Sequence, residues 1–294
     1  MAALQKAIAL AQQTDTTVIA LHAFTLPPYA HEGIAANLLE RIRRQSREAA
    51  VRPLQDLAVP GLVTTLLGEG QPVPQILEAI VELRPSLVIM GSHGRRGADR
   101  MMLGSVVEKV VHKAEVPVMV VHAEQTQSST TVVLCAVDLE DDARSVLELA
   151  QRYARSIDGT VEVIHAYAIP GRAYPRFDPQ LALELEEEIR RTAGRKLASL
   201  EGELGPFRTH LVAGKPGKAI VGLAAKLQPA AIVMATQGRG GLGRAFLGSV
   251  TEWVLRRSPF PVLTTRPPDS AAPRTQEQTT RNGAEGAHAP EPEA

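Results

Sequence analysis

Short apolar runs alternate with amphipathic segments along most of this chain, most clearly between residues 131 and 266. The apolar runs have the length and composition of buried strands, while the segments between them carry apolar residues at helical spacing, such as Val146, Leu149 and Tyr153. The expected strands are 131–137, 160–165, 207–213, 230–234 and 261–265. The expected helices are 143–156, 179–204, 218–227 and 249–257. This alternation predicts an α/β fold whose mostly parallel sheet carries helices on both faces.

The pattern occurs twice. Gly104 and Gly248 lie 144 residues apart, and His22 and His165, further upstream in each copy, lie 143 apart. A repeat of this length is a whole domain. We therefore expect a first domain at 1–123, a linker at 124–130, a second domain at 131–266 and a tail at 267–294. The tail is rich in Pro, Gly, Ala and charged residues, so we expect it to be disordered.

The first copy is expected to lack one strand. At the offset of 143, Met1 aligns with Arg144, so strand 131–137 and Asp138 have no counterpart in the given sequence. In a doubly wound sheet the first strand is usually central, and its loss would leave neighbouring backbone groups unpaired. We expect either that the chain starts further upstream or that a strand from elsewhere fills the gap.

Composition narrows the function classes. The chain has 294 residues, of which 44% are hydrophobic, and its 32 Lys and Arg balance its 32 Asp and Glu. Balanced charge and only 3% aromatic residues argue against a nucleic-acid partner. We see neither a signal peptide nor an apolar run long enough to span a membrane. The single cysteine, Cys135, lies in an apolar run and is expected to be buried, which suits a reducing cytoplasm.

A glycine-containing junction between a strand and a helix occurs in each copy. The first runs from Gly91 to Ser105, and the second runs from Ala235 to Ser249. Glycines allow backbone N–H groups to approach an anion closely, and a helix N-terminus adds positive dipole. The alternative is a structural turn without a ligand. The sequence shows no specific metal-ligand spacing.

These junctions carry a motif, Gly-x-x-Gly, nine residues, then Gly-Ser. The chain is therefore similar to the universal stress protein family in its tandem form. The resemblance implies two doubly wound, Rossmann-like domains of the adenine nucleotide alpha hydrolase type, with five parallel strands each, and ATP, with or without Mg²⁺, at the carboxyl ends of the strands. The motif positions stand as Gly91, Gly94, Gly104 and Ser105 in the first copy and as Gly238, Gly248 and Ser249 in the second.

The resemblance also implies roles for these residues. The motif residues would hold phosphate and ribose, Asp138 would face the nucleoside, and the backbone of Ala166 would contact adenine. Arg95 and Arg239 repeat between the copies and suggest phosphate neutralisation. The second copy departs from the pattern because Ala235 stands where the first glycine belongs.

We expect a cytoplasmic stress-response regulator that binds ATP without established catalysis. The last strands, 118–121 and 262–265, would pair the two domains with each other, and a homo-oligomer and an unidentified protein partner are further expectations. One alternative is a nucleotide-free interaction protein of the same fold, and the other is a slow ATP hydrolase. Capping or phosphate contact is the favoured role of Ser105 and Ser249, because no base for a serine nucleophile is identifiable.

Overall fold

The computed structural model describes residues 2–26, 35–55, 59–92, 103–122, 130–139, 143–168, 178–237 and 247–266. The first half contains α1 (Ala2–Thr14), β1 (Val18–Phe24), α2 (Ala36–Gln55), β2 (Val63–Glu69), α3 (Pro72–Leu83), β3 (Val88–Gly91), α4 (Ser105–Lys113) and β4 (Val118–Val121). The second half contains β5 (Val132–Ala136), α5 (Ala143–Ser156), β6 (Thr160–Tyr167), α7 (Pro179–Leu204), β7 (Arg208–Ala213), α8 (Pro216–Leu227), β8 (Ala231–Ala235), α9 (Ser249–Arg257) and β9 (Val262–Thr265). The elements follow the alternation expected from the sequence in both halves.

The larger sheet has the strand order β3-β4-β9-β8-β5-β6-β7. Within the second half all pairings are parallel, with β5 central between β8 and β6. This confirms the expected α/β class and the five-stranded parallel sheet of the second domain.

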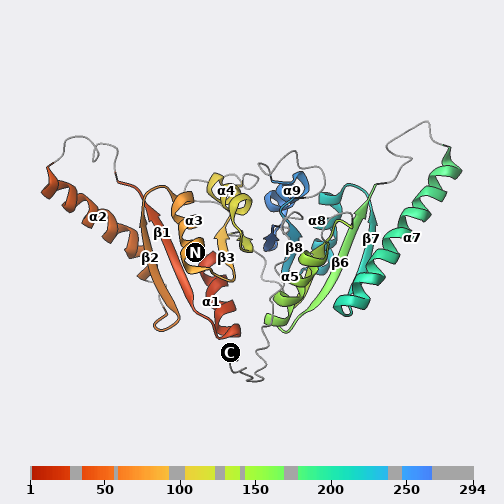
Figure 1. Cartoon of the computed structure of the whole chain (residues 1–294), viewed down its shortest axis with the longest axis horizontal. Helices are drawn as coiled ribbons and strands as arrows, with labels where there is room; N and C mark the ends of the chain where they lie inside the picture. Colours follow the sequence, from red (N-terminus) through yellow and green to blue (C-terminus); the bar gives the residue numbers. More distant parts are fainter. Residues whose placement is uncertain are drawn as a thin grey trace, which may run out of the picture.

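The two halves meet through their last strands. Strands β4 and β9 pair antiparallel, with Met119 opposite Leu263, and the Thr264 hydroxyl donates to the Val118 carbonyl at 3.0 Å. Figure 1 shows the remaining strands of each half spreading away from this central seam.

In the first half, β1 and β2 form a separate parallel pair. The described residues contain no strand between β1 and β3, where the second half has β5. The first domain is thus described without the central strand, as the repeat alignment predicts.

Two apolar layers cover the larger sheet. The alternation of side chains along each strand sends Val118 and Val120 to the layer under α3, α4, α8 and α9, and Met119 and Val121 to the layer under α5. Cys135 belongs to the second layer and is fully buried, as the sequence predicts.

One helix boundary differs from its prediction. Helix α8 begins at Pro216, two residues before the predicted Lys218, with Lys215 as its N-cap. Proline suits the first helical turn because its missing N–H would have no partner inside the helix there.

Candidate functional site

The two glycine junctions have the same backbone path where the structure describes them. In the second half, β8 ends at Ala235, and the Gly248 amide donates to the Thr236 carbonyl at 2.9 Å. In the first half, the Gly104 amide donates to the Ser92 carbonyl, also at 2.9 Å. These bonds bring the start of each helix to the carboxyl end of the strand that precedes the junction.

Each helix begins on a glycine that supplies no side-chain cap. Gly104 has φ −62° and ψ 137°, Gly248 has φ −60° and ψ 138°, and neither helix start shows a side-chain cap hydrogen bond. The first-turn N–H groups of a helix have no partner within the helix. The first turns of α4 and α9 therefore offer backbone donors and dipole to an anion. Ser105 and Ser249 are the first residues of these turns, and both are exposed.

Ala235 fits its position without backbone strain. It is the last residue of β8, it pairs with Thr265, and it is not among the described residues with positive φ. Its carbonyl accepts a hydrogen bond from the buried Thr251 hydroxyl of α9 at 2.7 Å. A glycine is thus not required there by backbone conformation, and α9 is tied directly to the end of β8.

Asp138 and Ala166 lie at the same edge of the sheet as the α9 junction. Asp138 follows β5 and is exposed, while Ala166 is the next-to-last residue of β6. Because β5 lies between β8 and β6, the three strand ends are neighbours. The His165 imidazole lies 3.1 Å from the Val137 carbonyl through Nδ1, so this histidine joins the ends of β5 and β6.

The first half places its motif residues differently. Gly91 ends β3 and Gly104 precedes α4, but β1, which carries the counterpart of Ala166, belongs to the other sheet. The described residues of the first half contain no counterpart of Asp138. Four further predicted residues lie outside the described residues, namely Gly94, Arg95, Gly238 and Arg239.

A polar cluster beside this edge was missed by the sequence reasoning. The Tyr167 hydroxyl donates to Glu186 Oε1 at 2.9 Å, and Arg190 Nη1 donates to the same hydroxyl at 3.5 Å. Burial of Tyr167, then its bond to Glu186, raises the pKa of the phenol. The strand predicted at 160–165 ends two residues before Tyr167, whereas β6 continues to Tyr167. The cluster is identified only by the hydrogen bonds that join Glu186 and Arg190 of α7 to Tyr167 of β6.

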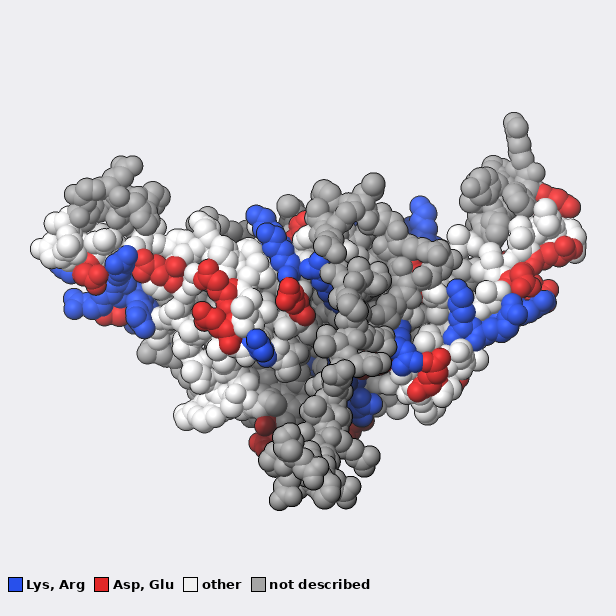
Figure 2. All heavy atoms as spheres, in the orientation of Figure 1, with Lys and Arg blue, Asp and Glu red and all other residues white. Residues whose placement is uncertain are grey.

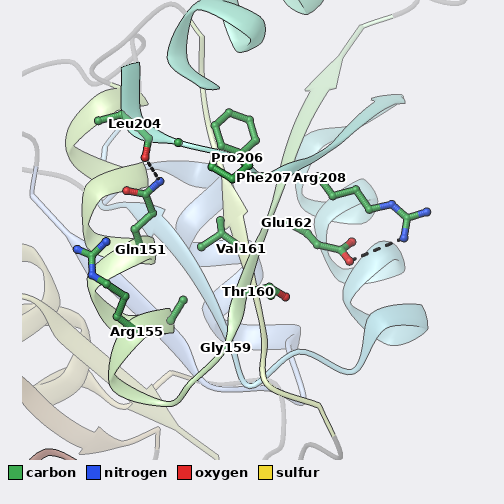
Figure 3. Close-up of a pocket in the computed structure, with 12 residues that line it drawn as sticks. Gln151, Arg155, Gly159, Thr160, Val161, Glu162, Leu204, Pro206, Phe207 and Arg208 are labelled. Carbon is green, nitrogen blue, oxygen red and sulfur yellow. Dashed lines mark hydrogen bonds and ion pairs between the residues drawn. The ribbon is translucent and has the colours of Figure 1, made fainter. Parts of the chain in front are cut away.

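Two hollows in the described part of the chain lie away from this edge. One, of about 630 Å³, lies where β6 and β7 begin and is lined by Arg155, Glu162 and Arg208 among others. Figure 3 shows Gln151 of α5 donating to the Leu204 carbonyl on one side and Glu162 facing Arg208 on the other. The other, of about 600 Å³, lies between the ends of α1 and α5. Neither contains a predicted site residue.

The surface charges are mixed. On the face in Figure 2, blue and red side chains are interspersed along the two long helices. On α2, Arg43 pairs with Glu40 and Glu69 at 3.3 and 3.1 Å, and on α7 Arg191 pairs with Glu188 at 3.0 Å. Within the described ranges, no group of three His, Cys, Asp or Glu side chains is arranged to hold a metal ion. No helix in those ranges is long and apolar enough to cross a membrane.

Comparison with known proteins identifies the repeat. The model of the universal stress protein family matches residues 1–122 and again residues 130–266. A universal stress protein of Mycobacterium tuberculosis strain H37Rv is 29% identical over 210 residues, which cover 66% of this chain and 66% of the relative. The chain thus spans just under two thirds of that relative. Another from the same strain is 27% identical over 237 residues, covering 77% of this chain and 74% of the relative.

A solved structure shows the same fold. The universal stress protein from Archaeoglobus fulgidus matches over 90% of this chain and 92% of its own length, with a TM-score of 0.63 and 24% identity. The likeness shows that the two proteins share a fold over most of this chain.

Proposed function

The chain belongs to the universal stress protein family, and on that premise we propose that its second half binds an adenine nucleotide, ATP in the first instance. The site would lie at the carboxyl ends of β8, β5 and β6. The phosphates would contact the first turn of α9, and the nucleoside would lie toward Asp138 and Ala166.

The start of α9 carries this proposal. Gly248 places backbone N–H groups at the sheet edge and supplies no side chain to satisfy them. Such a helix start favours a phosphate group by hydrogen bonding and by dipole. Alanine in place of the motif glycine at position 235 is compatible with this proposal. The backbone of Ala235 does not have a positive φ, and its carbonyl accepts a hydrogen bond from the Thr251 hydroxyl.

The position of the strand ends supports the nucleoside half of the site. Open α/β sheets bind ligands beyond the carboxyl ends of their strands, at the point where the strand order reverses. Here the chain runs from β5 to β6 and β7 on one side and then crosses to β8 and β9 on the other, so the order reverses between β5 and β8. Asp138, directly after β5, would accept hydrogen bonds from ribose or adenine, and an extended backbone at Ala166 offers one donor and one acceptor to the base.

We further propose binding without turnover, in a cytoplasmic regulator. Phosphate contact would order the start of α9, and that ordering would alter the surface seen by a protein partner. A bound Mg²⁺ would accompany the phosphates. Any homo-oligomer would need a surface other than the edges of β4 and β9 that already face each other. The nucleotide-free interaction protein and the slow ATP hydrolase are the alternatives that the test must separate.

The test is isothermal titration of the full chain with ATP, AMP and adenosine, with and without Mg²⁺. Gly238→Val in the second half and Gly94→Val in the first form a matched pair of variants. We expect binding by the wild type and by Gly94→Val, and a loss of ATP binding in Gly238→Val of about tenfold or more, equivalent to about 1.4 kcal/mol.

Each other outcome rejects a specific part of the proposal. Absence of binding heat with all three ligands would favour the nucleotide-free interaction protein. Steady release of phosphate from ATP by the wild type, lost in Gly238→Val, would favour the hydrolase. Equal loss in both variants would mean that both halves are needed.

A further inference from the structure

The two longest helices of the described chain are each packed along only part of their length. Helix α2 has 20 residues and its first buried residue is Ala50, while α7 has 26 residues and its first buried residue is Ala193. We call residues 36–49 of α2 and residues 180–192 of α7 the outer segments. Each outer segment is about 20 Å long at the rise of an α-helix. Figure 1 shows α2 and α7 at opposite ends of the molecule.

The outer segments expose large apolar side chains. Leu38 of α2 is 45% exposed, and Leu181 and Leu183 of α7 are 44% and 63% exposed. These are three of the six large apolar side chains that are exposed among the described residues. Removal of apolar surface from water is favourable, so a partner that covers these leucines would be stabilised by them.

The outer segment of α2 is basic. It contains four arginines and two glutamates. Arg41 and Arg44 are exposed and form no ion pair with another described residue. Leu38, Arg41 and Arg44 follow one another at a spacing of three residues, which makes successive members neighbours on the helix surface. This surface therefore presents one apolar and two basic side chains.

The outer segment of α7 is acidic over most of its length. Its first ten residues contain four glutamates and no other charged residue, and Figure 2 shows acidic side chains gathered at the outer end of this helix. Glu184 and Glu187 are exposed, and among the described residues they interact within α7 alone, with Gln180 at 3.2 Å and Arg191 at 3.8 Å. Leu183 is adjacent to both glutamates on the helix surface.

The two outer segments cannot meet within one copy of the chain. The remainder of α2 packs against β1 and β2, and the remainder of α7 packs against β7, so each helix is anchored at its own end of the molecule. The basic surface that would complement α7 is nevertheless carried by this same chain, on α2. The opposite charges therefore identify a second copy as the partner.

We propose that the outer segments form the interface of a dimer of this chain. The outer segment of α2 contacts that of α7 in the partner copy, and a two-fold axis generates the reciprocal contact, so the assembly closes at two copies. A stable interface buries about 1,200 Å² or more, and two helix crossings contribute twice the area of one. This interface uses neither the β4–β9 seam nor the proposed nucleotide site, and it goes beyond the proposed function.

Charge also selects the pairing. Complementary potentials favour association, whereas like charges placed opposite each other disfavour it. Arg41 and Arg44 would face Glu184 and Glu187 of the partner copy. Pairing of α2 with a second α2, or of α7 with a second α7, would bring like charges together, so the mixed pairing is favoured.

The first measurement is the mass of the full chain in solution. Sedimentation equilibrium from about 1 to 100 µM spans the range of a weak to moderate dimer. We expect a mass that approaches twice the 31.5 kDa of one chain. The dissociation constant should rise with salt, because exposed charges are screened.

Matched variants test the apolar part of the interface. Leu183→Gln removes an exposed leucine of the outer segment, and Val81→Gln removes a side chain that is 70% exposed on α3, outside both outer segments. Glutamine is a good helix former, so both variants should fold, which circular dichroism would verify. We expect Leu183→Gln to weaken dimerisation by about tenfold or more, because the dimer contains two copies of this contact. Val81→Gln should stay within about threefold of the wild type.

Exchange of charges tests which helices pair. One variant carries Arg41→Glu and Arg44→Glu, and the other carries Glu184→Arg and Glu187→Arg. Each variant alone places like charges in both contacts, so we expect self-association to weaken by about tenfold or more. An equimolar mixture restores opposite charges in both contacts. We therefore expect a heterodimer, detected by sedimentation with one variant fluorescently labelled, with an affinity within about threefold of the wild type.

Three results would overturn the proposal. The first is a wild-type protein that stays monomeric over the whole concentration range. The second is a dimer with the same affinity in the wild type and in Leu183→Gln. The third is a mixture of the two charge variants that associates no better than either variant alone.

Discussion

Replacement of Gly248 by aspartate separates helix stability from phosphate binding. Gly248 is the N-cap of α9 with φ −60° and ψ 138°, a conformation open to any residue, and it supplies no side-chain cap. Aspartate is a preferred N-cap because its carboxylate accepts hydrogen bonds from first-turn N–H groups. The variant therefore occupies with its own carboxylate the donors that the proposal assigns to phosphate.

The two expected effects have opposite signs. Aspartate in place of glycine at an N-cap stabilises a helix by a few tenths of a kcal/mol, and its charge near the positive end of the dipole adds about 0.3–1 kcal/mol. Loss of two N–H bonds to a charged phosphate costs about 1.5–3 kcal/mol each. Even at the lower value, ATP binding would weaken by about 3 kcal/mol, or about a hundredfold.

The assay combines calorimetric titration with thermal unfolding. We expect Gly248→Asp to have an unchanged or higher Tm, to bind ATP about a hundredfold more weakly, and to bind adenosine as the wild type does. The matched control is Gly104→Asp, because Gly104 has nearly the same geometry at the start of α4. That variant should leave second-half binding intact. Wild-type affinity for ATP in a folded Gly248→Asp protein would refute the assignment of phosphate to α9.

Three further predictions concern single residues. Asp138→Asn should weaken the binding of ATP and of adenosine by a similar factor, about tenfold, because the carboxylate is assigned to the nucleoside. A weaker affinity for ATP alone in calorimetric titration would contradict that role. Gly217→Ala should lower the free energy of unfolding by about 1–3 kcal/mol, because the new Cβ would lie 2.7 Å from the Trp253 ring. In the control Gly222→Ala on the same helix, the new Cβ meets nothing within 4 Å, so this variant should be more stable by about 0.5–1 kcal/mol. Urea unfolding would measure both changes. Tyr153→Phe should stabilise at neutral pH by about 1 kcal/mol, because the Tyr153 hydroxyl is buried without a partner among the described residues. Burial raises the pKa of Tyr153 to about 12, so the free energy of unfolding of the wild type should fall as pH rises above the unfolded pKa of about 10. Tyr153→Phe removes this titration, and a variant with the same alkaline loss of stability as the wild type would contradict the reasoning.

Local chemistry determined much of the second half. The apolar run around Cys135 predicts a strand buried on both faces, and β5 is the central strand of a parallel sheet. Gly248 and Ser249 predict a helix start after a strand, and α9 begins there. These features depend on residues close together in the chain, so the sequence alone specifies them.

The sequence pattern did not predict contacts between segments that are far apart in the chain. The bond from Thr251 to the Ala235 carbonyl depends on the docking of α9 against β8. The Tyr167–Glu186–Arg190 cluster depends on α7 placing Glu186 and Arg190 beside the Tyr167 hydroxyl. No periodicity reports such contacts, because they are formed by packing between elements.

The sequence by itself determined the repeat and the order of strands and helices. Tertiary structure decided which strands pair: β4 joins β9 across the two halves, and β1 with β2 forms a separate sheet from β3. The physical reason is that hydrophobic periodicity specifies which face of an element is buried. The neighbour of each strand is chosen by backbone hydrogen bonds between segments far apart in the chain.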